Sequence, residues 1–77
     1  MEANDVERIL QQAFENCDVS VASDGGHVNI LLVGDVFDGL NRVKRQQLVY
    51  AALNEHIVSG ELHAVNMKTF TSEEYQT

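Results

Sequence analysis

Hydrophobic and polar residues follow a helical period at the start of this chain and a strand period soon after. Apolar side chains recur every three or four positions near the N-terminus, which predicts an amphipathic helix over about residues 5–16. Asn4, with Glu7 three positions later, predicts its N-terminal cap. Val19 and Val21 then alternate with polar neighbours, a pattern typical of a half-buried strand. The helical stripe consists of Val6, Ile9, Leu10, Ala13 and Phe14.

A β-hairpin is predicted next. Asp24-Gly25-Gly26 is a turn in which the glycines supply positive φ, and Val28–Val33 follows as the second strand. The run Asn29–Val33 is almost continuously apolar. This predicts that the second strand is central in its sheet and largely covered.

A long helix is predicted from about residue 41 to 58, after a loop at Phe37–Leu40. Asn41 is its expected cap and Gly60 its expected stop. Gly39 lies in the loop, where a turn of this kind needs a residue that tolerates positive φ. One side of the helix is marked by Val43, Gln47, Tyr50 and either Leu53 or Asn54.

The remaining elements complete an α+β domain over residues 1–77. A third strand is predicted over Leu62–Met67, and Thr71-Ser72-Glu73-Glu74 is typical of the start of a short C-terminal helix. The order is then α-β-β-α-β-α. The helical crossover before the third strand permits parallel pairing, which gives a mixed sheet of three strands. We expect two layers, with the helices on one face of that sheet.

Composition narrows the classes of function. Twelve acidic and five basic side chains give a net charge of −7, and such a chain is repelled by nucleic acid unless its cations gather on one face. Arg42, Lys44 and Arg45 do gather at the start of the long helix. We expect no enzyme, because the chain shows no paired carboxylates, no nucleophile with a recognisable base and no glycine-rich phosphate loop.

Cysteine usage and the N-terminus favour a cytoplasmic protein. Cys17 is the one cysteine of the chain, so no intrachain disulfide and no C-x-x-C motif can form. We expect this residue to be a small, partly buried filler. The N-terminal segment is acidic and lacks a long apolar run. We therefore expect no signal peptide and no membrane span.

Three histidines are the candidate metal ligands. His27 opens the second strand at the hairpin tip, His56 lies late in the long helix, and His63 falls within the predicted third strand. Taken one at a time, each is more typical of an ordinary turn, surface or strand histidine than of a ligand. No pair has the i, i+4 spacing of a helical zinc site. The residues alone therefore do not predict a self-contained metal site.

The basic segment Asn41–Gln47 has three interpretations. The preferred interpretation is a docking surface for a protein partner. The second is a solvated helix start, in which the aliphatic parts of the arginine and lysine side chains cover apolar surface. The third is a helix start that contacts DNA. The predicted element order is similar to that of the second type of KH domain. However, a KH domain needs a G-x-x-G loop that clamps nucleotides, and this chain has none.

The segment Phe37–Tyr50, F-D-G-L-N-R-V-K-R-Q-Q-L-V-Y, resembles the signature segment of the BolA family, in its branch of small acid-stress proteins. The similarity continues through Leu62-His63-Ala64-Val65 and Lys68-Thr69-Phe70-Thr71, at the spacing of that family. The resemblance implies a BolA-like fold related to the second KH type. In that fold the long helix is either continuous or broken in two.

The resemblance also implies a shared iron–sulfur cluster. In BolA-like proteins a histidine in the context I/L-H-A is associated with ligation of a [2Fe–2S] cluster, and His63 occupies this position. The second ligand comes from the loop between the first two strands, where His27 is the candidate. A monothiol glutaredoxin contributes its active-site cysteine, and a glutathione bound to the glutaredoxin contributes its thiolate. Histidine ligation leaves such a cluster less negatively charged and raises its potential.

We therefore expect an adaptor that binds a monothiol glutaredoxin and serves iron–sulfur trafficking under acid or oxidative stress. Alone, it is expected to be a monomer or a weak homodimer. A transcriptional regulator that uses the Asn41–Gln47 helix start on DNA is the alternative.

Overall fold

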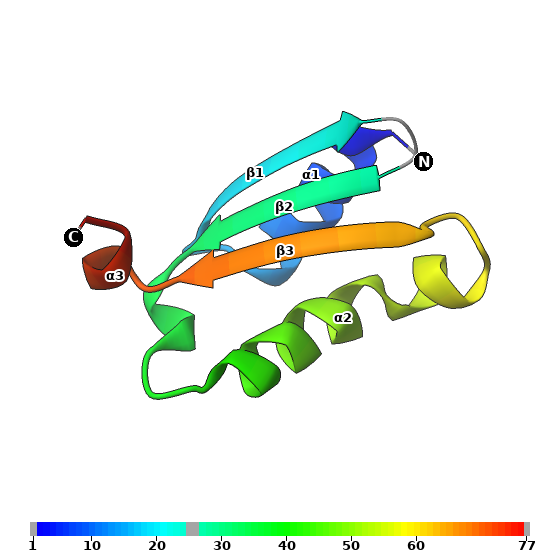
Figure 1. The fold of residues 1–77 in the computed structure, drawn as a ribbon. Coiled ribbons are helices and arrows are strands. Elements are labelled where there is room, and N and C mark those ends of the chain that lie inside the picture. The colour runs from blue at the N-terminus through cyan, green and yellow to red at the C-terminus, as the bar shows by residue number, and fades with distance from the viewer. Residues whose placement is uncertain (1, 25–26, 77) are drawn as a thin grey trace.

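The computed structural model describes residues 2–24 and 27–76. The three strands form one sheet in the order β1-β2-β3, in which β1 is antiparallel and β3 parallel to β2. In Figure 1, α1 lies behind the sheet and α2 runs beside β3. The elements are α1 (Ala3–Ala13), β1 (Asp18–Asp24), β2 (His27–Val33), the short 3₁₀ helix η1 (Asp35–Phe37), α2 (Arg42–Val58), β3 (Ala64–Phe70) and α3 (Ser72–Gln76).

This architecture confirms the predicted α+β order, the mixed sheet and the central position of the second strand. Asp24 pairs with His27, so β1 and β2 form the predicted hairpin; the predicted turn residues Gly25 and Gly26 lie outside the described residues. No helix within the described ranges is both long enough and apolar enough to cross a membrane.

One hydrophobic core lies between the sheet and the helices α1 and α2. Alternate residues of β2 point into it, as expected for a strand with one face on the core. The ring of Phe14, just after α1, packs on that of Phe37 in η1 with the centroids 6.0 Å apart. Its buried members are Val6, Leu10, Cys17, Val28, Ile30, Leu32, Phe37, Val49, Leu53 and Leu62.

The N-terminal cap of α1 differs from the prediction. The Glu2 N–H donates to Asp5 Oδ2 at 3.0 Å, so α1 begins at Ala3 and the predicted pair Asn4 and Glu7 lies inside the helix. Both pairs have the spacing of a cap. The residue pattern could not choose between them, and the prediction was wrong.

The start and end of α2 confirm the sequence prediction. The Asn41 side chain caps the helix, since its Oδ1 accepts the Lys44 N–H at 2.9 Å. The helix then runs without a break to Val58. Gly60, with φ of +85°, supplies the left-handed residue that ends it.

The side of α2 that the sequence predicted is only partly correct, because Leu53 is the one residue of that set that is buried. Val43 and Tyr50 are 60% and 42% exposed, whereas Val49 and Leu53 are completely buried. Apolar residues lie on all sides of this helix, so spacing alone could not identify the face that packs on the sheet.

The third strand begins later and ends later than predicted. It starts at Ala64 and runs to Phe70, beyond the predicted Leu62–Met67. Leu62 is buried in the hydrophobic core, and the residue after it, His63, precedes the strand instead of lying within it. The predicted C-terminal helix is confirmed as α3.

Candidate functional site

The three basic residues at the start of α2 point to three different places. Arg42 lines a groove between α2 and β3. Lys44 lines a shallow hollow on the outer side of α2, together with Leu40 and Leu48. Arg45 turns back onto its own chain. The three cations that the sequence gathers at the start of the long helix therefore lie on separate surfaces.

Arg45 ties α2 to the C-terminal part of the molecule. Its guanidinium donates from Nη1 and Nη2 to the two carboxylate oxygens of Glu74, at 2.7 and 3.1 Å. Its Nε donates to the Leu40 carbonyl at 2.9 Å, and Nη1 also reaches the Thr69 carbonyl at 3.4 Å. Its side chain is only 13% exposed. This geometry gives Arg45 an intramolecular role and lends no support to its prediction as a partner contact.

Glu74 is held ionised by its hydrogen bonds. The Arg45 guanidinium, followed by the Thr71 N–H at 2.8 Å, lowers the pKa of Glu74 to about 2. In return, the hydrogen bonds that Arg45 donates to Glu74 raise the pKa of Arg45. Since the Glu74 N–H also donates to Thr71 Oγ1 at 3.1 Å, the same carboxylate completes a capping box at the start of α3.

A groove runs between the first half of α2 and the second half of β3. It has a volume of about 700 Å³ and continues into a second hollow of about 810 Å³, and both share Arg42, Gln46, Met67 and Lys68. Neither Arg42 nor Lys68 takes part in an ion pair within residues 2–24 and 27–76. In a chain of net charge −7, this groove keeps two cations available beside apolar surface. Lys68 is a candidate contact that sequence reasoning missed, because only the fold brings it next to Arg42.

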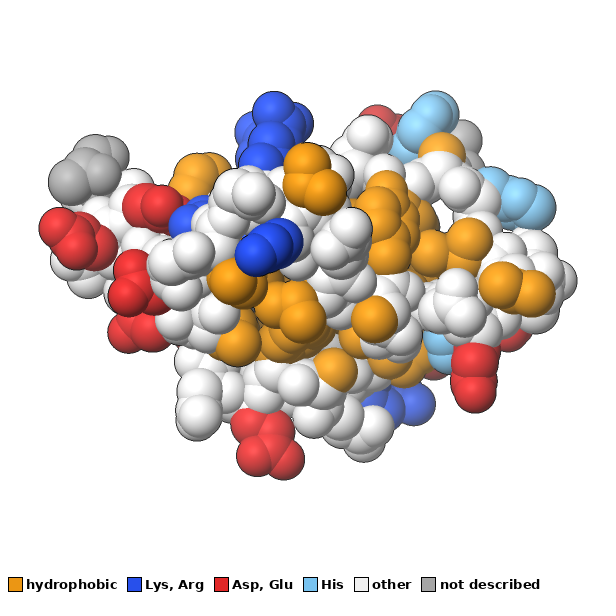
Figure 2. Space-filling view, turned by 90° about the horizontal axis from the view of Figure 1, so that it is seen from below, with side chains coloured by type: hydrophobic (Ala, Val, Ile, Leu, Met, Phe, Trp, Pro, Cys, Tyr) orange, Lys and Arg blue, Asp and Glu red, His pale blue; other side chains and the backbone are white. Residues whose placement is uncertain are grey.

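The two predicted cluster ligands meet at one end of the sheet. His27, the first residue of β2, pairs in register with Ala64, the first residue of β3, and His63 directly precedes Ala64. Both histidines are exposed. Figure 2 shows histidine side chains gathered at the end of the molecule opposite α3. The parallel register thus brings together two residues that lie far apart in the sequence.

The segment that carries His63 is fixed on its N-terminal side. The Leu62 N–H donates to the His56 carbonyl at 3.0 Å, and the Leu62 side chain is buried. His56 Nδ1 lies 3.1 Å from Glu61 Oε1, which also accepts from Ser59 Oγ at 3.0 Å. These contacts lower the pKa of Glu61, the one with His56 most. His56, expected to be a solvated helix residue, is in fact half-buried and supports the turn before β3.

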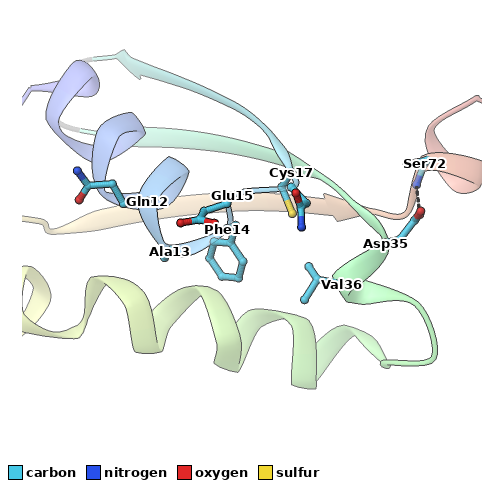
Figure 3. A pocket seen from close by; sticks show the side chains of 9 residues that line it. Gln12, Ala13, Phe14, Glu15, Cys17, Asp35, Val36 and Ser72 are labelled. Carbon is cyan, nitrogen blue, oxygen red and sulfur yellow. Dashed lines mark hydrogen bonds between the residues drawn. The ribbon is translucent and has the colours of Figure 1, made fainter.

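Cys17 lies at the other end of the sheet, away from the histidines. It borders a hollow of about 710 Å³ between the end of α1, η1 and the start of α3 (Figure 3). Burial above all, and then the charges of Asp18 and Asp35, raise the pKa of its thiol. A thiol that keeps its proton is a poor ligand and nucleophile. The buried position confirms the prediction of a filler.

The donor set at the histidine end fits a cluster only if a second molecule adds ligands. Within the described residues, no three His, Cys, Asp or Glu side chains are grouped so that they could hold a metal ion. Two exposed imidazoles fall short of the four ligands that a [2Fe–2S] cluster takes. Both imidazoles are exposed to solvent, so a partner molecule could supply the other ligands.

Comparison with known proteins identifies the family. The family model described as "BolA-like protein" matches residues 11–74. This chain belongs to the BolA family. The acid stress protein IbaG of Escherichia coli K12 is 41% identical over 75 residues, which cover 97% of this chain and 89% of that protein.

Solved BolA structures share the fold of this BolA-family chain. A bolA protein homologue from Coxiella burnetii superposes with a TM-score of 0.86 at 29% identity, over 100% of this chain and 99% of that one. BolA1 from Arabidopsis thaliana superposes with a TM-score of 0.78 at 33% identity, over 94% and 93% of the two chains. The similarity therefore covers the groove and the histidine end as well as the core.

Proposed function

We propose that this protein is a non-enzymatic BolA-type adaptor that binds a monothiol glutaredoxin and shares a [2Fe–2S] cluster with it in the cytoplasm. The observation that carries the proposal is the register of β2 and β3. It places His27 opposite Ala64 and thereby brings His63 to the same exposed end of the sheet. His63 and His27 are the residues that would hold the cluster. Glutaredoxin cysteine and glutathione would supply the two thiolates.

The role of this chain is to present two neutral imidazoles in fixed positions. A histidine can ligate a metal only when it is unprotonated, so binding of the cluster competes with protons. Leu62, buried on one side, and the Ala64–His27 pairing on the other restrict the backbone at His63. His27 opens β2 and pairs with Asp24 of β1 and Ala64 of β3. We assign the larger share of the binding to His63, the position that the family resemblance associates with ligation of the cluster.

The groove between α2 and β3 is the proposed docking surface for the glutaredoxin. Arg42 and Lys68 would attract acidic groups of the partner, and the apolar floor around Met67 would bury its hydrophobic ones. An acid stress role is supported by the name of the E. coli relative, acid stress protein IbaG. The DNA-binding alternative is less well supported, because Arg45 forms an ion pair with Glu74 and the start of α2 then presents few cations to DNA.

Anaerobic reconstitution tests this proposal. The protein is mixed with a monothiol glutaredoxin, glutathione, ferric iron and sulfide, and the complex is isolated by gel filtration. A heterodimer that absorbs visible light, and that does not form when either glutaredoxin or glutathione is left out, is the expected result. A cluster that binds this chain without the partner, or a glutaredoxin that never binds the chain, would refute the adaptor function.

A further inference from the structure

The outer side of α2 carries a stripe that no part of the described chain covers. Its residues recur at spacings of four, three, four and three, the pattern of the seam in a coiled coil. All of them are exposed, and Leu48 and Val58 are 39% and 78% exposed. Figure 2 shows this side of the molecule, with hydrophobic surface scattered along it. The stripe consists of Lys44, Leu48, Ala51, Glu55 and Val58.

We infer that this stripe is the interface of a symmetric homodimer, in which α2 packs antiparallel against α2 of a second copy. When two copies of the stripe run in opposite directions, the residues that face each other are complementary. With the two helices antiparallel and fully overlapped, Lys44 lies opposite Glu55 and Leu48 lies opposite Ala51. Each contact occurs twice, as a two-fold axis requires. The overlap extends along about 25 Å, the length of a helix of 17 residues.

Charge selects this arrangement over a parallel one. Parallel helices would place Lys44 opposite Lys44 and Glu55 opposite Glu55, so that like charges repel. In the antiparallel pair both contacts join opposite charges. Neither Lys44 nor Glu55 takes part in an ion pair within the described part of the chain. Both side chains are thus available to a second copy.

Shape supports the same register. The large Leu48 faces the small Ala51, which lets the helix backbones approach each other. Val58 of the second copy falls opposite Asn41, beside Leu40. There it meets a hollow of about 320 Å³ lined by Leu40, Lys44, Gln47 and Leu48. The most exposed apolar side chain of α2 therefore reaches a recess in the other copy.

The dimer is weak, because each copy carries a net charge of −7 and the seam contains only two apolar layers. It uses a side of α2 other than the groove of Arg42 and Lys68. Among the described residues, Leu40 alone lines both that groove and the hollow that receives Val58, and the test of the dimer does not involve the cluster.

Charge reversal tests the dimer without loss of the fold. Lys44→Glu places an acidic residue in the first turn of α2, and Glu55→Lys places a basic residue in its last turn. Both changes suit the helix dipole, so the helix should keep its stability. Sedimentation equilibrium is measured up to millimolar concentration for each variant, for an equimolar mixture of the two, and for the Lys44→Glu/Glu55→Lys double variant. Lys68→Glu and Glu15→Lys serve as controls that change the charge equally at other surfaces.

We expect each single variant to raise the dimer dissociation constant at least tenfold, and the double variant and the mixture to restore it. Glu55→Lys is the sharpest variant, because it lowers the overall repulsion and should still weaken the dimer. The controls should leave the constant within about threefold of the wild-type value. A wild-type protein that stays monomeric throughout this range, or a dimer that neither reversal weakens, would overturn the inference.

Discussion

Arg45 in α2 and Glu74 in α3 form a bidentate ion pair between residues 29 positions apart in the sequence. Because Arg45 also binds the Leu40 and Thr69 carbonyls, one side chain connects the loop before α2, the end of β3 and the C-terminal helix. A guanidinium has a fixed planar fork that matches such a set of acceptors, and a lysine ammonium does not. The residue is therefore structural.

Glu74→Gln should make the melting temperature depend less on pH in the acidic range. The pKa of Glu74 is lowered from 4.5 to about 2, so its contribution is fully present above pH 4.5 and is lost as the pH falls through about 2. Between these values the melting temperature of the wild type should fall more steeply than that of the variant. At neutral pH the variant should be the less stable of the two. Parallel curves for the wild type and the variant, with exposed Glu15→Gln as a charge control, would contradict this role.

Replacement of Gly39 should destabilise the turn before α2. Its φ of +79° lies in the left-handed region, while no described residue other than its two chain neighbours lies within 4 Å of the position of an added Cβ. The penalty for Gly39→Val is therefore conformational and should be about 1–2 kcal/mol in the free energy of unfolding. Gly39→Asn is the matched variant, since asparagine tolerates this region, and it should lose less. Equal losses in urea denaturation would mean that the strain is not the cause.

Local features of this chain were predictable, whereas contacts between distant segments were not. The Asn41 cap, the Gly39 turn and the stop at Gly60 depend on neighbouring residues, and the structure confirms all three. The pairing of His27 with Ala64 depends on the register of parallel strands joined by a long crossover, which the sequence pattern does not specify.

The buried face of α2 could not be predicted from the sequence either. Val49 and Leu53 are buried while Val43 is exposed, although all three are aliphatic and lie in the same helix. Which of them packs is decided by where α2 meets the sheet. Arg45, likewise, has a partner that only the position of α3 brings within reach.

Gly34→Ala should clash with Cys17. A Cβ at residue 34 would overlap the Cys17 Sγ, which is buried and cannot move into solvent. The variant should lose about 1–3 kcal/mol in the free energy of unfolding. Cys17→Ala removes the sulfur, so the double variant should be more stable than the sum of the two single effects predicts. Additive losses would show that the clash is relieved in another way.

Arg42→Glu and Lys68→Glu should weaken binding of glutaredoxin more than folding. Both cations line the groove without an ion pair in the described residues, so their reversal should raise the dissociation constant about tenfold while hardly changing the melting temperature. Arg8→Glu, at an exposed position of α1, is the matched control and should leave binding unchanged. Arg45→Glu should instead lower the melting temperature. Binding that is insensitive to Arg42 and Lys68, measured by calorimetry, would place the interface elsewhere.

The central claim is that His63 ligates the shared cluster, and visible circular dichroism of the reconstituted glutaredoxin complex tests it most directly. His63→Ala should abolish the signature of mixed histidine and thiolate coordination, while far-ultraviolet circular dichroism and the melting temperature show an intact fold. His27→Ala should weaken the same signature less, because solvent or another donor can replace a ligand at the end of a hairpin. A visible spectrum that is identical for the wild type and His63→Ala would contradict the assignment of His63, and with it the cluster function proposed for this end of the sheet.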